Sequence, residues 1–184
     1  MPALDRIQAW LAVQYFRGTS VSKKIEVSAL SEIRGSRYPA PYDRACDGRV
    51  RRSLGDAAGL TQFGVNLTRL PGGCWSSQRH WHRVEDEFIF VLEGTVVLVT
   101  NSGEETLIAG DSAGFKAGIA DGHHLQNRSS LDAIILEVGT RRPDDDEVAY
   151  TDIDLLALKG RSGYAHKSGE AYVGKKPRNP ATGE

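Results

Sequence analysis

The chain has 184 residues, of which 40% are hydrophobic and 26% are charged, and its formal net charge at pH 7 is −1. This length allows one domain with a sizeable core, and these proportions exclude a disordered or membrane-embedded chain. The near-zero charge gives no general attraction to nucleic acid or to an anionic membrane, so we expect neither as a partner. No stretch has the apolar length of a transmembrane helix, and Asp5 and Arg6 interrupt the place where a signal peptide would begin its apolar core. Since Cys46 and Cys74 are also too few for a disulfide framework, we expect a cytoplasmic protein.

The first third of the chain is expected to lie outside the main domain. Apolar residues at helical spacing predict a short amphipathic helix over residues 3–16, within an N-terminal extension over residues 1–33. Residues 34–59 are expected to form an irregular arm, because turn-forming residues are frequent between 34 and 48. This arm ends in a small basic cluster, which we expect to be a solvated or structural face and not an anion site: Arg49, Arg51 and Arg52.

From Leu60 onward, short segments rich in β-branched and aromatic residues alternate with turns, which indicates an all-β sandwich or barrel over residues 60–140. The predicted strands are Thr61–Leu70, Arg79–Arg83, Phe88–Leu92, Thr95–Thr100, Glu105–Leu107, Ser112–Phe115, His123–Asn127 and Asp132–Val138. Residues 141–184 are expected to form a C-terminal segment and tail, since they begin with a charged stretch and end rich in Gly, Lys and Pro.

The histidines are the residues most suggestive of chemistry. Four of the five fall in two tight pairs, His80 with His82 and His123 with His124. Residues i and i+2 share a face on a β-strand, so His80 and His82 are expected to point the same way. The charged residues 83–86 predict a turn, after which Glu87 opens the next strand of a hairpin on the same side.

Two stretches of the sequence resemble the paired motifs of the cupin superfamily. The run from Gly73 through His80-Trp81-His82 and Glu87 to Gly94 is similar to the first motif. The run from Gly110 through Gly118 and His123 to Asn127 is similar to the second motif. The resemblance implies a double-stranded β-helix, also called a jelly-roll barrel, with a metal ion inside it.

The resemblance also implies which residues would hold that ion: His80, His82, Glu87 and His123. His124 is the alternative to His123, because neighbours on a strand face opposite ways and only one of them can point inward. Imidazole and carboxylate ligands suit several first-row ions, so Zn, Fe, Mn, Ni and Co all fit. No catalytic residue follows from the motifs.

Further stretches, among them residues 38–43 and 54–56, resemble a bacterial subgroup of small single-domain cupins loosely described as sugar-phosphate or mannose-6-phosphate isomerases. This implies a metal-dependent enzyme that acts on a small polar, sugar-like or oxygen-rich metabolite by isomerase, lyase or oxygenase chemistry. The alternative is a non-catalytic module that binds or senses a small ligand in the same cavity. Because exposed edges of such barrels are commonly covered by self-association, we expect a homodimer.

Overall fold

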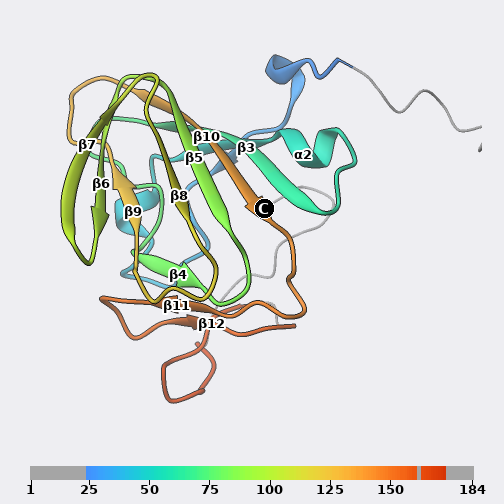
Figure 1. Ribbon diagram of the computed structural model, residues 1–184, viewed down its shortest axis with the longest axis vertical. Helices are drawn as coiled ribbons and strands as arrows, with labels where there is room; N and C mark the ends of the chain where they lie inside the picture. Colours follow the sequence, from blue (N-terminus) through green and yellow to red (C-terminus); the bar gives the residue numbers. More distant parts are fainter. Residues whose placement is uncertain (1–23, 161–162, 173–184) are drawn as a thin grey trace, which may run out of the picture.

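The computed structural model describes residues 24–160 and 163–172, so the helix expected over residues 3–16 lies outside the described residues. The regular structure of the described chain consists mostly of antiparallel strands (Figure 1). The strands are β1 (Ile33–Arg34), β2 (Val50–Ser53), β3 (Phe63–Leu70), β4 (His80–His82), β5 (Glu87–Glu93), β6 (Thr95–Thr100), β7 (Gly103–Ile108), β8 (Ser112–Phe115), β9 (His124–Gln126), β10 (Ala133–Thr140), β11 (Val148–Tyr150) and β12 (Leu156–Ala157). The short helices are η1 (Val27–Ala29), η2 (Arg44–Cys46) and α2 (Leu54–Ala57).

The strands form a jelly-roll barrel, as predicted. One sheet has six strands in the order β1-β2-β3-β10-β5-β8, and a smaller sheet with the order β7-β6-β9 faces it. A third sheet, β12-β11-β4, lies across one end of the barrel, where Figure 1 shows it below the other strands. All eight predicted strands are present, and their ends differ from the predicted ones by no more than two residues.

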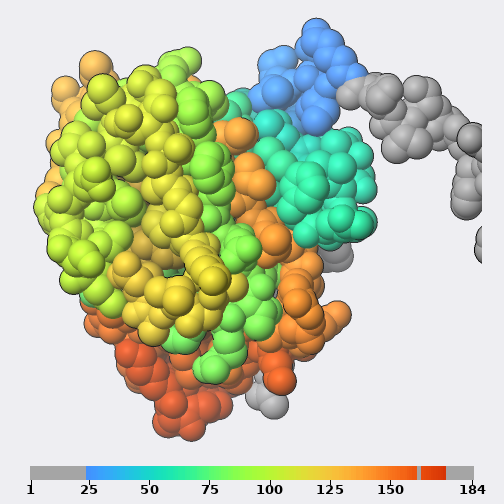
Figure 2. Space-filling view, viewed as in Figure 1, coloured from blue at the N-terminus to red at the C-terminus, as the bar shows by residue number. Residues whose placement is uncertain are grey.

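The sequence analysis missed several regular elements. Strand β2 and helix α2 lie within the segment that was expected to be irregular, and β2 pairs with β3 along its whole length. Strands β11 and β12 follow residue 140, where only a C-terminal segment was expected. Strand β11 pairs with β4, and Figure 2 shows the C-terminal segment (orange to red) continuous with the surface at that end of the barrel.

The hydrophobic core lies between the six-stranded sheet and the β7-β6-β9 sheet. Alternate residues of the central strands supply it, and Val91, Val96 and Ile135 are all 0% exposed. The turn between β5 and β6 requires glycine, because Gly94 has a φ of 78° and an added Cβ would lie 2.7 Å from the carbonyl oxygen of Asp132. This tight turn keeps β5 and β6 close enough to enclose the core.

No helix within the described ranges is both long enough and apolar enough to cross a membrane.

Candidate metal centre

Strand β4 carries the first two histidines of the predicted site. Its extended backbone places His80 and His82 on one face, with ring centroids 5.2 Å apart. Both are mostly buried, with side-chain exposures of 13% and 14%. Trp81 lies between them on the other face, where the Arg83 guanidinium lies 5.9 Å from its ring centroid.

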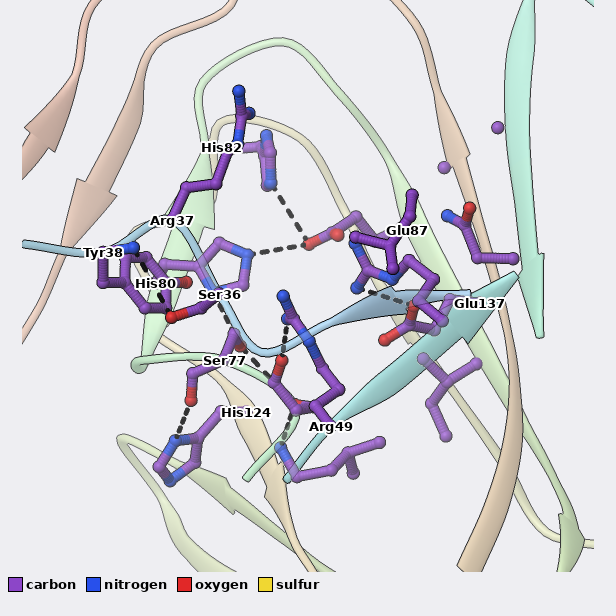
Figure 3. Close-up of a pocket in the computed structure, with 18 of the residues that line it drawn as sticks. Ser36, Arg37, Tyr38, Arg49, Ser77, His80, His82, Glu87, His124 and Glu137 are labelled. Carbon is purple, nitrogen blue, oxygen red and sulfur yellow. Dashed lines mark hydrogen bonds and ion pairs between the residues drawn. The ribbon is translucent and has the colours of Figure 1, made fainter. Parts of the chain in front are cut away.

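Glu87 meets these histidines because the chain turns back at residues 83–86 and Glu87 opens β5, as predicted. One carboxylate oxygen, Oε2, lies 3.6 Å from Nε2 of His80 and 3.5 Å from Nε2 of His82. The same oxygen lies 2.9 Å from Nε2 of His123. The structure therefore brings the four residues together, and Figure 3 shows His80 and His82 directed at Glu87.

His123 and His124 lie in different surroundings, as expected of neighbours in an extended segment. His123 is joined to β4 by backbone hydrogen bonds with His80 in both directions, and its ring stacks on Phe115 with centroids 3.5 Å apart. His124 instead has its Nδ1 3.0 Å from the Ser77 carbonyl oxygen and packs edge-on against Trp75. Figure 3 shows His124 apart from Glu87, so the geometry favours His123 as the fourth member of the set.

A hydrogen-bond partner orients each imidazole at its other nitrogen. Nδ1 of His80 donates to the Gln78 carbonyl oxygen at 2.9 Å, and Nδ1 of His123 lies 3.4 Å from the carbonyl oxygen of Asp121. Since a carbonyl oxygen can only accept, the contact of His80 places its proton on Nδ1 and leaves its Nε2 lone pair directed at Glu87, whereas Nε2 of His123 lies within hydrogen-bond distance of Glu87 Oε2. This is the usual arrangement of histidines that bind a metal through Nε2.

His82 has a carboxylate in the corresponding position. Its Nδ1 lies 2.6 Å from Oδ2 of Asp146, which is itself only 7% exposed and also accepts a hydrogen bond from the backbone N–H of Val84. Glu85 lies farther from the same nitrogen, at 3.8 Å. His82, Glu85 and Asp146 together form a second cluster of ligand-type atoms. Because its shortest contact is the one to Nδ1 of His82, we interpret Asp146 as the group that orients this ring.

The ionisation of the cluster suits a cation. Burial would raise the pKa of Glu87, but the hydrogen bond with His123 and the nearby His80 and His82 outweigh it and hold that pKa well below its ordinary value. Burial lowers the pKa of His80 to about 4, so this ring is neutral at neutral pH and its Nε2 can act as a ligand. Burial also opposes protonation of His82, yet the Asp146 hydrogen bond and the Glu87 charge leave its pKa raised.

The donor set fits a divalent transition ion. Two ligands each about 2.1 Å from one ion lie no more than about 4.2 Å apart, and the three distances from Glu87 Oε2 to the imidazoles meet that limit. The Nε2 lone pair of the neutral His80 ring faces the Glu87 carboxylate and repels it unless a cation lies between them. The ligand atoms of His80, Glu87 and His123 all lie within 4.8 Å of one another, and a metal ion among them would satisfy these three groups at once, with His82 Nε2 3.5 Å from the same Glu87 oxygen.

A cavity of about 1150 Å³ opens beside the cluster. All four predicted ligands line it, together with residues 32–40 and parts of β2, β3 and β10. Hydroxyl and amide side chains are present in the lining, among them Ser36, Ser53 and Asn66. The site therefore has room beside the cluster for a small polar molecule.

Asp146 is the clearest residue near the site that the sequence analysis missed. It lies in the charged stretch before β11, which was expected to belong to a C-terminal segment after the barrel, and it is 64 residues from His82 in sequence. No local pattern signals such a contact. Only the pairing of β11 with β4 brings the two residues together.

We expect Asp146→Asn to weaken metal binding about 10- to 100-fold, because the amide removes the charge that supports His82 and can donate a competing hydrogen bond. Titration calorimetry in competition with a chelator measures the effect. Asp145→Asn is the matched control, since Asp145 is exposed and pairs only with Arg142 in the contacts found. Equal affinities for the Asp146 variant and the unchanged protein would contradict the orienting role.

Comparison with known proteins agrees with this architecture. The Cupin domain family matches residues 66–139. No curated protein matches the chain. A sugar phosphate isomerase from the cupin superfamily of Silicibacter pomeroyi is 40% identical, with a TM-score of 0.77, and the match covers 82% of this chain and 97% of that one.

Two further structures are similar over shorter parts of the chain. A protein of Acidithiobacillus ferrooxidans, provisionally described as a sugar phosphate isomerase, is 29% identical, with a TM-score of 0.60. The match covers 69% of this chain and 81% of that one. The polyketide cyclase RemF of Streptomyces resistomycificus is 18% identical, with a TM-score of 0.56 and coverage of 72% and 87%, which shows the fold alone. The 40% identity over nearly the whole Silicibacter pomeroyi protein, together with the barrel and the matched domain, shows that this chain belongs to the cupin superfamily.

Proposed function

We propose that this cupin binds one divalent transition metal ion through His80, His82, Glu87 and His123, and that it is a metal-dependent enzyme acting on a small polar metabolite. The observation that carries the proposal is the convergence of three imidazole Nε2 atoms on one half-buried carboxylate oxygen beside a large cavity. A barrel needs no such cluster for stability, because apolar side chains fill a core without polar groups to satisfy.

The chain's own residues would hold the ion and restrict its surroundings. Phe115 and Tyr150 stack against His123 and His80, which limits rotation of these rings. The hydrogen bonds at Nδ1 fix which nitrogen faces the ion. When bound, the ion would polarise substrate oxygen atoms as a Lewis acid.

Isomerase chemistry on a sugar phosphate is the most specific activity that has support. The Silicibacter pomeroyi protein with that description is similar to this chain over 97% of its own length. The hydroxyl and amide groups of the cavity suit a substrate rich in oxygen atoms. We place lyase and oxygenase chemistry after isomerisation.

We also propose a cytoplasmic homodimer. Apolar side chains on the described surface favour self-association, since Ile119 and Leu131 are 55% and 74% exposed. Sedimentation of the purified protein would give the mass of a dimer if this proposal is right and the mass of a single chain if it is wrong.

Activity screening tests the catalytic proposal. Protein loaded with Zn, Fe, Mn, Ni or Co is incubated with aldose and ketose phosphates beside the variants His80→Ala and His82→Ala. We expect turnover to be lost in both variants and kept in the control His166→Ala, because His166 pairs with Asp154 outside the cluster. Turnover that survives both cluster variants would exclude a metal-centred mechanism. Ligand binding without any turnover would favour the alternative, a binding or sensing module.

A further inference from the structure

The cavity beside the cluster contains two arginines without an acidic partner. Five arginines line it, and three of them form ion pairs: Arg34 with Glu32, Arg51 with Glu137, and Arg141 with Asp56. Arg37 and Arg49 form no ion pair with any carboxylate in the described part of the chain. Among the described residues that line the cavity, these two are the arginines with no carboxylate within ion-pair distance.

Arg49 is the more unusual of the two, because it is only 9% exposed. Its Nε and Nη2 donate to the Gly35 carbonyl oxygen at 3.2 and 2.8 Å, and its Nη1 donates to the Ser76 carbonyl oxygen. These are three hydrogen bonds from a group that has five N–H donors, so two donors are left over. Figure 3 shows the guanidinium directed into the cavity.

The two carbonyl groups fix the plane of the guanidinium but leave its charge unbalanced. A buried charge without a counter-charge is unfavourable, whereas a bound oxyanion would supply both the charge and acceptors for the free donors. The arginine fork matches carboxylate and phosphate oxygens particularly well. Arg49 is therefore held in place for an anion that the described chain does not supply.

Arg37 lines the same cavity and comes from the arm over residues 34–59. Figure 3 shows its side chain extended along the cavity toward the end where His82 lies. Unlike Arg49 it is exposed, so it can move toward a ligand. The two arginines thus approach the cavity from different parts of the chain.

We infer that Arg49, assisted by Arg37, binds an oxyanion of the substrate, a phosphate monoester or a carboxylate, while other substrate oxygens face the His80, His82, Glu87 and His123 cluster. The inference rests on the proposed function and adds the charge of the substrate and the residues that recognise it. It also revises the interpretation of the basic cluster at residues 49–52 as a solvated or structural face. Arg51 and Arg52 are structural in this sense, because both form ion pairs, and Arg49 is the exception.

A purely structural role for Arg49 is the competing explanation, since its hydrogen bonds tie the arm to the loop before β4. Calorimetric titration with inorganic phosphate and with acetate separates the two, in metal-free and in cobalt-loaded protein. The variants are Arg49→Lys and Arg37→Met. The control is Arg34→Met, which removes an arginine of the same cavity whose partner Glu32 keeps a second ion pair with Arg52.

We expect Arg49→Lys to weaken binding of phosphate or acetate by at least about tenfold and Arg37→Met to weaken it by about threefold, while Arg34→Met stays within about twofold. If phosphate binding depends on the two arginines, the recognised substrate group is a phosphate. If acetate binding depends on them, the group is a carboxylate. Thermal unfolding shows whether each variant is folded. If Arg49→Lys is not folded, the anion affinity of Arg37→Met decides between the anion site and the purely structural role.

The inference is overturned if the unchanged protein binds neither anion, or if the folded arginine variants bind as tightly as the unchanged protein. Anion binding that requires cobalt but has the same affinity in both arginine variants as in the unchanged protein would also overturn the inference. It would leave the proposed metal site intact. Arginine-dependent binding in a protein that takes up no metal would support the anion site and contradict the proposed function.

Discussion

Glu87→Gln is expected to weaken transition-metal binding by at least about 100-fold, which is more than the loss of an orienting group produces. Glu87 is the only acidic member of the predicted ligand set, and its Oε2 lies at the point where the three Nε2 atoms meet. Glutamine keeps the size of the side chain but removes the negative charge. A dication would then be buried among neutral imidazoles without compensation. Calorimetry with Zn and Co in competition with a chelator measures the change.

Glu93→Gln is the matched control for this substitution, because Glu93 lies at the far end of the same strand and is exposed. We expect its metal affinity to stay within about threefold of that of the unchanged protein, as surface changes away from a site usually have small effects. If Glu87→Gln also stayed within that range, Glu87 could not be a ligand.

Ile135→Ala is expected to lower the free energy of unfolding by about 2–5 kcal/mol. Ile135 is 0% exposed and lies in β10, which pairs with β3 on one side and with β5 on the other. Its side chain belongs to the core between the two sheets, so truncation removes packed apolar atoms and leaves a cavity. Chemical denaturation of metal-free protein gives the value without a contribution from bound metal.

The control for this prediction is Ile108→Ala, the same substitution at a strand end that is 56% exposed. We expect Ile108→Ala to lower the free energy of unfolding by less than about 0.5 kcal/mol. If Ile135→Ala lowered the free energy of unfolding by less than about 1 kcal/mol, Ile135 could not be a tightly packed residue of the core.

The geometry of the histidine cluster could be predicted from the sequence because it follows from local rules. Strand periodicity places His80 and His82 on one face, and the charged turn returns Glu87 to them. The same periodicity required that His123 and His124 point apart, although it could not say which of them joins the cluster. The answer depends on the bridge between His80 and His123, which is a contact between distant parts of the chain.

The groups around the cluster could not be predicted, because only tertiary contacts bring them there. Asp146 reaches His82 through the pairing of β11 with β4, and the short, mostly polar segment before β11 gives no strand signal. Arg49 stands in a run of arginines that is typical of a solvated surface. Its burial goes with contacts between distant segments, since its guanidinium donates to the carbonyl oxygens of Gly35 and Ser76.

Elemental analysis of the protein, purified without chelator, tests the metal site most directly. We expect about one transition metal ion per chain in the unchanged protein, as for a single site with this ligand set, and little or none in His80→Ala. Protein that contains no transition metal after purification, and gains none on titration with Zn, Fe, Mn, Ni or Co, would contradict the metal site.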